Sequence, residues 1–368
     1  MPQRIVFLIP GELDSLTGGY GYDRQVIAGL RGAGWGVDIL NLDASYPWPD
    51  AQAQARTAAL IAAIPDGALV VADGLAFGAM PDLAELHADR LRWVALVHHP
   101  LAHETGLDRA QQACFRVSES RALAAARAVI VTSAYTAQGL ADFGVAPERI
   151  TVVEPGTEAV PLARLGQALG APVRREGLSL LCVATLTPRK GHLVLVEALA
   201  GLKDRAWTLD CVGSLGFDPA TVAGVEAAVL AHGLQGRVHL HGEVSAQALA
   251  AFHHQADVFV LPSHFEGYGM ALADALAHGL PVCSTTAGAI PDTVPADAGV
   301  LVPAGDVLAL RGALARLLDE PDWRFSLAQG ARRARDRLPT WAATVSAFAQ
   351  TLEHVGQGKA GLKSRSHN

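Results

Sequence analysis

The sequence has few aromatic residues, few cysteines and no long apolar run. Aromatic residues make up 6% of the 368 residues. No run of roughly eighteen apolar residues occurs, so no transmembrane helix is expected. The first residues, MPQRIVFLIPGEL, contain a short apolar run that acidic residues follow, unlike a signal peptide. We therefore expect a cytoplasmic globular protein, and peripheral contact with the inner face of a membrane stays open.

The cysteines and the charge exclude two further classes. The four cysteines, Cys114, Cys182, Cys211 and Cys283, lie far apart and form no Cys-x-x-Cys pair. Three of them fall in predicted buried strands, so we expect reduced core thiols. The net charge of −7 argues against a general nucleic-acid binder, because such a protein needs a positive surface that neutralises phosphates.

The length and the apolar pattern predict an α/β protein of two domains. Half of the residues are hydrophobic, and short buried strands alternate with helical segments. We expect one doubly wound domain over residues 1–160, a linker over 159–177 and a second doubly wound domain over 175–340. A final amphipathic helix covers 341–355, and the tail 356–368 is expected to be disordered.

The stretch Asp257–Ser284 is the most informative part of the chain. Its sequence, DVFVLPSHFEGYGMALADALAHGLPVCS, predicts a strand, a polar loop, a helix and a second strand. The predicted helix begins near Tyr268 and ends where Gly279 acts as a left-handed cap. Its N-terminus follows a loop with two glycines, Gly267 and Gly269, and unpaired backbone N–H groups make such a site favourable for a phosphate.

A second loop carries positive charge toward a helix start. Thr187–Gly191 leads into a helix, and Arg189 and Lys190 stand at its entrance. Two cations oppose the helix dipole there, so they favour a counter-anion such as a diphosphate. The alternative is that both are ordinary surface cations.

A glycine-rich turn follows the first strand. Residues Pro10–Tyr22 are predicted as a loop that contains Gly18 and Gly19, at the place where doubly wound domains bind ligands. The sequence GGYG lacks the Gly-x-Gly-x-x-Gly spacing, so a nicotinamide cofactor is not expected. A plain flexible turn is the alternative.

Two histidines follow the strand predicted over Trp93–Val97. His98 and His99 lie at the carboxyl end of a parallel strand, where such sheets carry their chemistry. A metal site of His98, His99, His103 and Glu104 is not expected, because adjacent residues of an extended strand point to opposite faces. From the residues alone, a structural histidine is the alternative for each.

The acidic stretch and its flanks carry a family resemblance. The order E-G-Y-G-M-A-L-A-D, preceded by FVLPS and followed by HGLPV and GAIPDTV, resembles the Glu-x7-Glu element of glycosyltransferase family 4. The resemblance implies the GT-B fold, in which two Rossmann-like domains face each other across a cleft. It also implies a retaining enzyme that uses a nucleotide sugar. Glu266 would contact the hydroxyls of the donor sugar and Asp274 the nucleotide ribose, although Asp274 replaces the usual second Glu.

The resemblance assigns further roles. The catalytic candidates are His98, with His99 as second choice, Lys190 and Glu266. The predicted donor-binding residues are Gly18, Gly19, Arg189, Lys190, Glu243, Val244, Glu266, Gly269, Met270, Ala271 and Asp274. The family's early arginine of the diphosphate loop is replaced by Thr185.

We therefore expect a metal-independent hexosyltransferase that takes a UDP- or GDP-sugar and an unidentified acceptor, with no cofactor. No Asp-x-Asp occurs that would hold a catalytic metal ion in the way of the other common glycosyltransferase architecture. The arginine-bearing helix predicted over 108–127 could contact an acidic acceptor or membrane, or simply be a solvated face. Two alternatives remain: a sugar phosphorylase or synthase on the same fold, and a nucleotide-sugar-binding protein that has lost catalysis.

Overall fold

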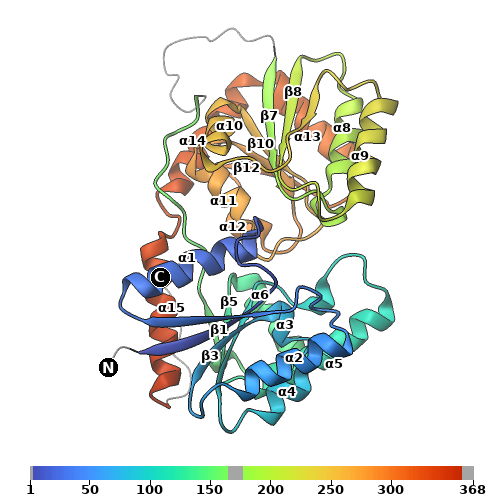
Figure 1. The fold of residues 1–368 in the computed structure, drawn as a ribbon. Helices are drawn as coiled ribbons and strands as arrows, with labels where there is room; N and C mark the ends of the chain where they lie inside the picture. Colours follow the sequence, from blue (N-terminus) through green and yellow to red (C-terminus); the bar gives the residue numbers. More distant parts are fainter. Residues whose placement is uncertain (1–2, 165–176, 359–368) are drawn as a thin grey trace. The chain divides into compact units, whose positions relative to one another are not determined.

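The computed structural model describes residues 3–164 and 177–358. The chain forms two compact units (Figure 1). Unit 1 comprises residues 1–156 and 339–368, and unit 2 comprises residues 157–338. Part of the predicted linker, residues 165–176, and nearly all of the tail predicted to be disordered, residues 359–368, lie outside the described residues.

Unit 1 is built on a parallel sheet with the strand order β2-β1-β3-β4-β5-β6. Its strands are β1 Arg4–Pro10, β2 Gly36–Leu42, β3 Leu69–Asp73, β4 Arg92–Val97, β5 Ala128–Val131 and β6 Ile150–Val152. Its helices are α1 Gly18–Gly32, α2 Ala51–Ala62, α3 Gly74–Phe77, α4 Pro81–Leu86, α5 Arg109–Ala125, α6 Ala134–Gly139 and α15 Trp341–Gly356. Three short 3-10 turns, Leu101–His103, Leu140–Phe143 and Pro147–Arg149, complete it.

Successive side chains of the unit 1 strands point to opposite faces of the sheet, and both faces are covered. On one face, Phe7 of β1 stacks on Phe348 of α15, with ring centroids 6.1 Å apart. On the other face, Trp93 of β4 belongs to the same buried cluster as Phe115 of α5. The near-continuous apolar runs of these strands follow from burial on both sides.

The C-terminal helix α15 belongs to unit 1. It packs on α1, where Gly29 gives it room: a Cβ at Gly29 would lie 2.3 Å from a methyl group of Val345. Thr344 of α15 donates its hydroxyl to the carbonyl of Glu154, at 2.8 Å. The chain therefore returns to its first unit after it has completed the second.

Unit 2 repeats the architecture with the strand order β12-β11-β10-β7-β8-β9, again all parallel. Its strands are β7 Leu178–Val183, β8 Trp207–Val212, β9 Val238–Leu240, β10 Val258–Leu261, β11 Val282–Thr285 and β12 Gly299–Val302. Helices α8 His192–Ala200, α9 Pro219–Ala231 and α13 Val307–Asp319 gather on one side of the sheet in Figure 1. The other side of the sheet carries helices α10 Ala246–Gln255, α11 Met270–Ala277 and α14 Pro321–Arg335. Two short elements lie in the connecting loops, the helix α12 Ile290–Thr293 and the 3-10 turn η4 Pro188–Lys190.

The structure corrects two local predictions. Gly18 and Gly19 form the first turn of α1 rather than a loop, because the side chain of Thr17 accepts from the N–H of Tyr20 and caps the helix just before Gly18. The start of the predicted linker is also packed: Ala163 donates its N–H to the carbonyl of His278, at 2.8 Å. Residues 157–164 therefore belong to unit 2.

None of the helices in the described residues combines the length and apolar character that a membrane crossing requires.

Candidate active site

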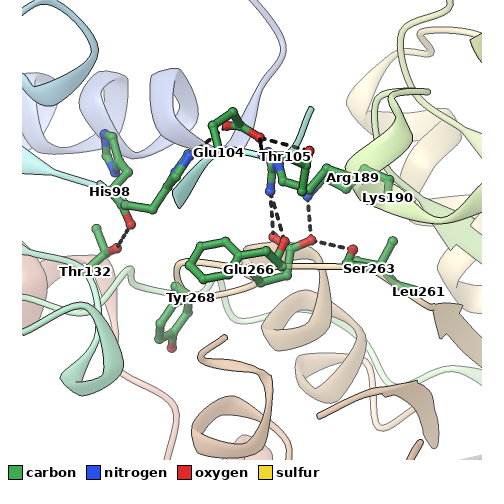
Figure 2. A network of polar contacts seen from close by, with 12 residues as sticks. His98, Glu104, Thr105, Thr132, Arg189, Lys190, Leu261, Ser263, Glu266 and Tyr268 are labelled. Atoms are coloured by element: carbon green, nitrogen blue, oxygen red, sulfur yellow. Dashed lines mark hydrogen bonds and ion pairs between the residues drawn. The ribbon is translucent and has the colours of Figure 1, made fainter. Parts of the chain in front are cut away.

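An ion pair joins two loops at the carboxyl ends of neighbouring strands in unit 2. Lys190 ends the 3-10 turn after β7, and Glu266 lies in the loop after β10, the strand that pairs with β7. The Nζ of Lys190 lies 2.6 Å from Oε1 of Glu266 (Figure 2). The turn requires a glycine at Gly191, which has a φ of +71° and whose Cβ would lie 2.2 Å from the carbonyl oxygen of Pro262.

The carboxylate of Glu266 is buried and held from several sides. The hydroxyl of Ser263 donates to its Oε1 at 2.6 Å, and the N–H of Ala289 donates to its backbone carbonyl at 2.9 Å. Burial alone would raise the pKa of Glu266, but the charges of Lys190 and Arg189 outweigh it and lower the pKa. Burial lowers the pKa of Lys190 despite the opposing effect of Glu266. Glu266 is therefore an ionised acceptor at neutral pH.

Arg189 ties the two loops together a second time. Its guanidinium donates to the carbonyl of Phe265 at 3.1 Å, and lies 3.8 Å from Oε2 of Glu266. In the reverse direction, the N–H of His264 donates to the carbonyl of Arg189 at 2.7 Å. The two cations and the carboxylate thus form one fixed group (Figure 2).

The helix α11 begins beside this group. Gly269 is its N-cap, with a φ of +92°, and supplies no side-chain cap to the first-turn amides of Met270 and Ala271. The positive end of a helix therefore lies three residues beyond Glu266 in the chain. Asp274, one turn further along α11, is exposed.

Two of the predicted donor-binding residues lie in the loop between β9 and α10. Glu243 is exposed, and Val244 packs partly buried against the core of unit 2. Thr185, at the position of the family's early arginine, follows β7 and is half-buried.

The polar group of unit 1 surrounds His98, directly after β4. The Nε2 of His98 lies 3.4 Å from Oδ1 of Asp23 on α1 and 3.7 Å from Oδ2 of Asp73 at the end of β3. Gly19 lies against the same imidazole, since a Cβ there would be 3.3 Å from Cδ2 of His98. The hydroxyl of Thr132 donates to the backbone carbonyl of His98 at 3.3 Å (Figure 2).

The two acids change the protonation of this group. Burial would lower the pKa of His98, but Asp23 and Asp73 outweigh it and raise the pKa. Burial, together with the charge of Asp23, raises the pKa of Asp73 to about 7. Neither oxygen of Asp23 meets hydrogen-bond geometry with a described residue, although the side chain is fully buried.

The remaining predicted histidine has a different partner. Nε2 of His99 lies 2.8 Å from Oε2 of Glu104, so its ring is held within its own loop. The two adjacent histidines therefore contact different acids.

Sequence reasoning missed Asp23 and Asp73. The signal for Asp23 was its place on the apolar face of α1, in the series 23, 26, 27 and 30, where the other members are Val26, Ile27 and Leu30. A charged residue on such a face needs a buried partner. Asp73 ends a buried parallel strand, the kind of position that made His98 a candidate.

Two groups in the described residues have a geometry that could hold a metal ion. One is Asp23, Asp73 and His98, and the other is Cys182, His192 and Cys211. Within each group, the potential ligand atoms all lie within 4.8 Å of one another. Neither group includes Lys190 or Glu266.

Comparison with known families gives two matches that follow one another along the chain. Residues 26–159 match the family described as "Glycosyltransferase Family 4", and residues 177–320 match "Glycosyl transferases group 1". Similar curated proteins include a D-inositol 3-phosphate glycosyltransferase from Xylanimonas cellulosilytica, 32% identical over 254 residues that cover 64% of this chain. An MMP alpha-(1->4)-mannosyltransferase from Mycolicibacterium hassiacum is 29% identical over 71% of this chain. The chain spans 60% and 66% of the length of these two relatives, respectively.

Solved structures share the fold. A sucrose-phosphate synthase from Thermosynechococcus elongatus superimposes with a TM-score of 0.81 at 24% identity, over 97% of this chain and all of that one. HepE of Anabaena, solved in complex with UDP and glucose, gives a TM-score of 0.72 at 17% identity, over 95% of this chain and 99% of that one.

Proposed function

Because this chain belongs to the group 1 and family 4 glycosyltransferases and has their GT-B fold, we propose that it transfers a sugar from a UDP- or GDP-sugar to a hydroxyl-bearing acceptor. The observation that carries the proposal is the Lys190–Glu266 pair of 2.6 Å, which joins the ends of neighbouring strands. Glu266 lies three residues before Gly269, the N-cap of α11. A cation, a carboxylate and a helix N-terminus together suit a sugar that is linked to a diphosphate.

The proposed chemistry depends on charge that develops on the departing diphosphate. Lys190 and Arg189 supply fixed positive charge, and the amides of Gly269, Met270 and Ala271 supply oriented dipoles. Since these groups are already held in place, they cost little reorganisation when the sugar leaves. We therefore assign the leaving-group role to protein cations and amides, which makes catalysis independent of added Mg²⁺ or Mn²⁺.

Glu266 is assigned to the hydroxyls of the donor sugar. An ionised carboxylate accepts hydrogen bonds from hydroxyls, and the lowered pKa of Glu266 keeps it in that form. Asp274, exposed on α11, is assigned to the ribose, and the loop at Glu243 and Val244 to the base. Gly18 and Gly19, at the start of α1, add backbone amides for the diphosphate.

We assign His98 a contact with the donor sugar and propose that the reaction retains the anomeric configuration. The acceptor hydroxyl would lose its proton to the departing phosphate. The relatives named as acting on D-inositol 3-phosphate or as a mannosyltransferase support a small polyol or a sugar as acceptor. The free thiols of all four cysteines fit the reducing environment of the cytoplasm, where we place the protein.

A thermal-shift panel of UDP, GDP and their sugars tests the donor, because a ligand that binds the folded state raises its melting temperature. Donor hydrolysis is then measured for wild type, Lys190→Ala and Glu266→Ala. Lys203→Ala and Glu226→Ala are matched controls, since both residues are exposed elsewhere in unit 2.

We expect one nucleotide to raise the melting temperature. Wild type and both control variants should hydrolyse the donor, whereas Lys190→Ala and Glu266→Ala should not. Binding of a donor without any turnover would favour a binding protein that has lost catalysis. A requirement for free phosphate would favour a phosphorylase. If a chelator abolished wild-type activity and added Mg²⁺ or Mn²⁺ restored it, the role given to Lys190 would be contradicted.

A further inference from the structure

Two thiols lie side by side on the sheet of unit 2. Cys182 of β7 and Cys211 of β8 are register partners in adjacent parallel strands, so their side chains point to the same face of the sheet. Their residues are 0% and 2% exposed, respectively. Both are free thiols.

A buried imidazole completes the group. His192 is the first residue of α8, is 2% exposed, and places its Nε2 3.6 Å from Sγ of Cys182. Its Nδ1 has no hydrogen-bond partner in the described part of the chain. The ring is therefore oriented by its contact with sulfur and not by the backbone carbonyl or carboxylate that usually holds a buried histidine.

One distance within the group matches an edge of a tetrahedral metal site. The three potential ligand atoms all lie within 4.8 Å of one another. With Zn–S of about 2.3 Å and Zn–N of about 2.0–2.1 Å, the edge between a sulfur and a nitrogen ligand of a tetrahedron is about 3.6 Å. The distance from Cys182 to His192 has this length without rearrangement.

We propose that Cys182, His192 and Cys211 bind a thiophilic metal ion, with zinc as the first candidate. Two sulfurs and an imidazole, with no carboxylate, are the donor set that zinc and copper(I) prefer over magnesium or calcium. Two thiolates also neutralise a divalent zinc ion, which limits the cost of burying its charge.

The proposed ion would be structural, and its site is separate from the group that we assign to the donor. His192 follows Lys190 by two residues, with Gly191 between them. An ion that ties His192 to two strands would fix the start of α8, and with it the turn that carries Lys190. We therefore expect the loaded protein to melt at a higher temperature, whether or not the proposed transfer reaction is correct.

Cobalt(II) tests the site directly, because thiolate ligands give it an intense charge-transfer absorption and a tetrahedral site gives it visible ligand-field bands. The reduced full-length protein is stripped with a chelator and titrated with cobalt, and zinc is then added to displace it. The variants are Cys182→Ser, Cys211→Ser and His192→Gln. Cys283→Ser is the matched control, since Cys283 is also buried in the sheet of unit 2 but is not part of this group.

We expect a single cobalt ion per chain in wild type and in Cys283→Ser, lost or weakened at least tenfold in each ligand variant. Zinc should raise the melting temperature of wild type and of the control alone. A titration with copper(I) in the absence of oxygen shows whether zinc or copper(I) binds more tightly. Tight binding of either ion supports the site. Failure of the folded, reduced wild type to bind cobalt, zinc or copper(I) would overturn it, as would equal binding by His192→Gln, which keeps both thiols.

Discussion

The imidazole of His98 lies 3.4 Å from Oδ1 of Asp23, a carboxylate that is completely buried in unit 1. Such a carboxylate is costly to bury unless a cation or hydrogen bonds compensate it. His98 is the group closest to it that can carry a positive charge, and Asp23 is among the causes that raise the pKa of His98. The charge on His98 therefore depends on Asp23.

Asp23→Asn is expected to lower the pKa of His98, because the variant lacks the anion that favours the imidazolium. Titration of the His98 ring signals by NMR measures this directly, with the exposed Asp89→Asn as control. In a pH profile of donor hydrolysis, any limb that belongs to His98 should move to lower pH in Asp23→Asn. An unchanged His98 titration would contradict the proposed pairing.

The same pair predicts how stability depends on pH. A histidine whose pKa is raised on folding contributes stability that is complete below its unfolded pKa of about 6.5 and is lost as pH rises through the folded pKa. The unfolding free energy of wild type should therefore be higher than that of Asp23→Asn, and the difference should be largest at about pH 5. The difference should shrink or reverse at about pH 9, where the carboxylate is buried beside a neutral ring. Denaturant unfolding at both pH values is the measurement.

Lys190→Ala should impair both catalysis and stability. Loss of one fixed donor to a developing charge typically lowers kcat by about 10²–10³-fold. The variant also leaves the buried carboxylate of Glu266 without its closest cation, which costs about 3 kcal/mol when a buried pair is broken. The double variant Lys190→Ala with Glu266→Gln should recover part of the stability but none of the activity. Recovery of activity would contradict the role of Lys190.

Gly288→Ala should disturb the position of Glu266. Gly288 has a φ of +61°, and a Cβ there would lie 2.3 Å from the carbonyl oxygen of Glu266. The backbone conformation alone costs an L-residue about 1–2 kcal/mol, and the clash adds to it. We expect a lower melting temperature and weaker donor binding. Gly312→Ala is the control, because this helical site has nothing within 4 Å and should gain about 0.5–1 kcal/mol.

Asp274→Asn should weaken nucleotide binding without unfolding the protein, because the side chain is exposed on α11. Loss of one hydrogen bond to a ribose hydroxyl corresponds to roughly a tenfold increase in Kd. Calorimetric titration with the nucleotide found by thermal shift measures it. Asp274→Glu, which restores the longer acid of the family motif, should bind at least as tightly as wild type, and a Kd unaffected by Asp274→Asn would remove the residue from the site.

The family and the fold class were predicted correctly from the sequence. The strand predicted over Trp93–Val97 is β4 Arg92–Val97, and the final helix predicted over 341–355 is α15 Trp341–Gly356, each within one residue. Gly279 has the left-handed conformation, with a φ of +73°, that its place after a helix and before Pro281 required. The loop predicted over Gly18 and Gly19 was wrong because the cap at Thr17 acts before the glycines.

Other features depended on packing between distant residues. Lys190 and Glu266 are 76 residues apart in the sequence, and they pair because β7 and β10 are neighbours in the sheet. Asp23 of α1 and Asp73 of β3 converge on His98, which follows β4, and no local pattern records that approach.

Whether a segment forms a strand, a helix or a turn is a local property, because side-chain periodicity, glycine and proline act over a few residues. The chain could therefore be assigned to its fold and family from the sequence. Strand order and register act over the whole domain. They alone decided that Cys182 faces Cys211 and that a buried acid lies beside His98.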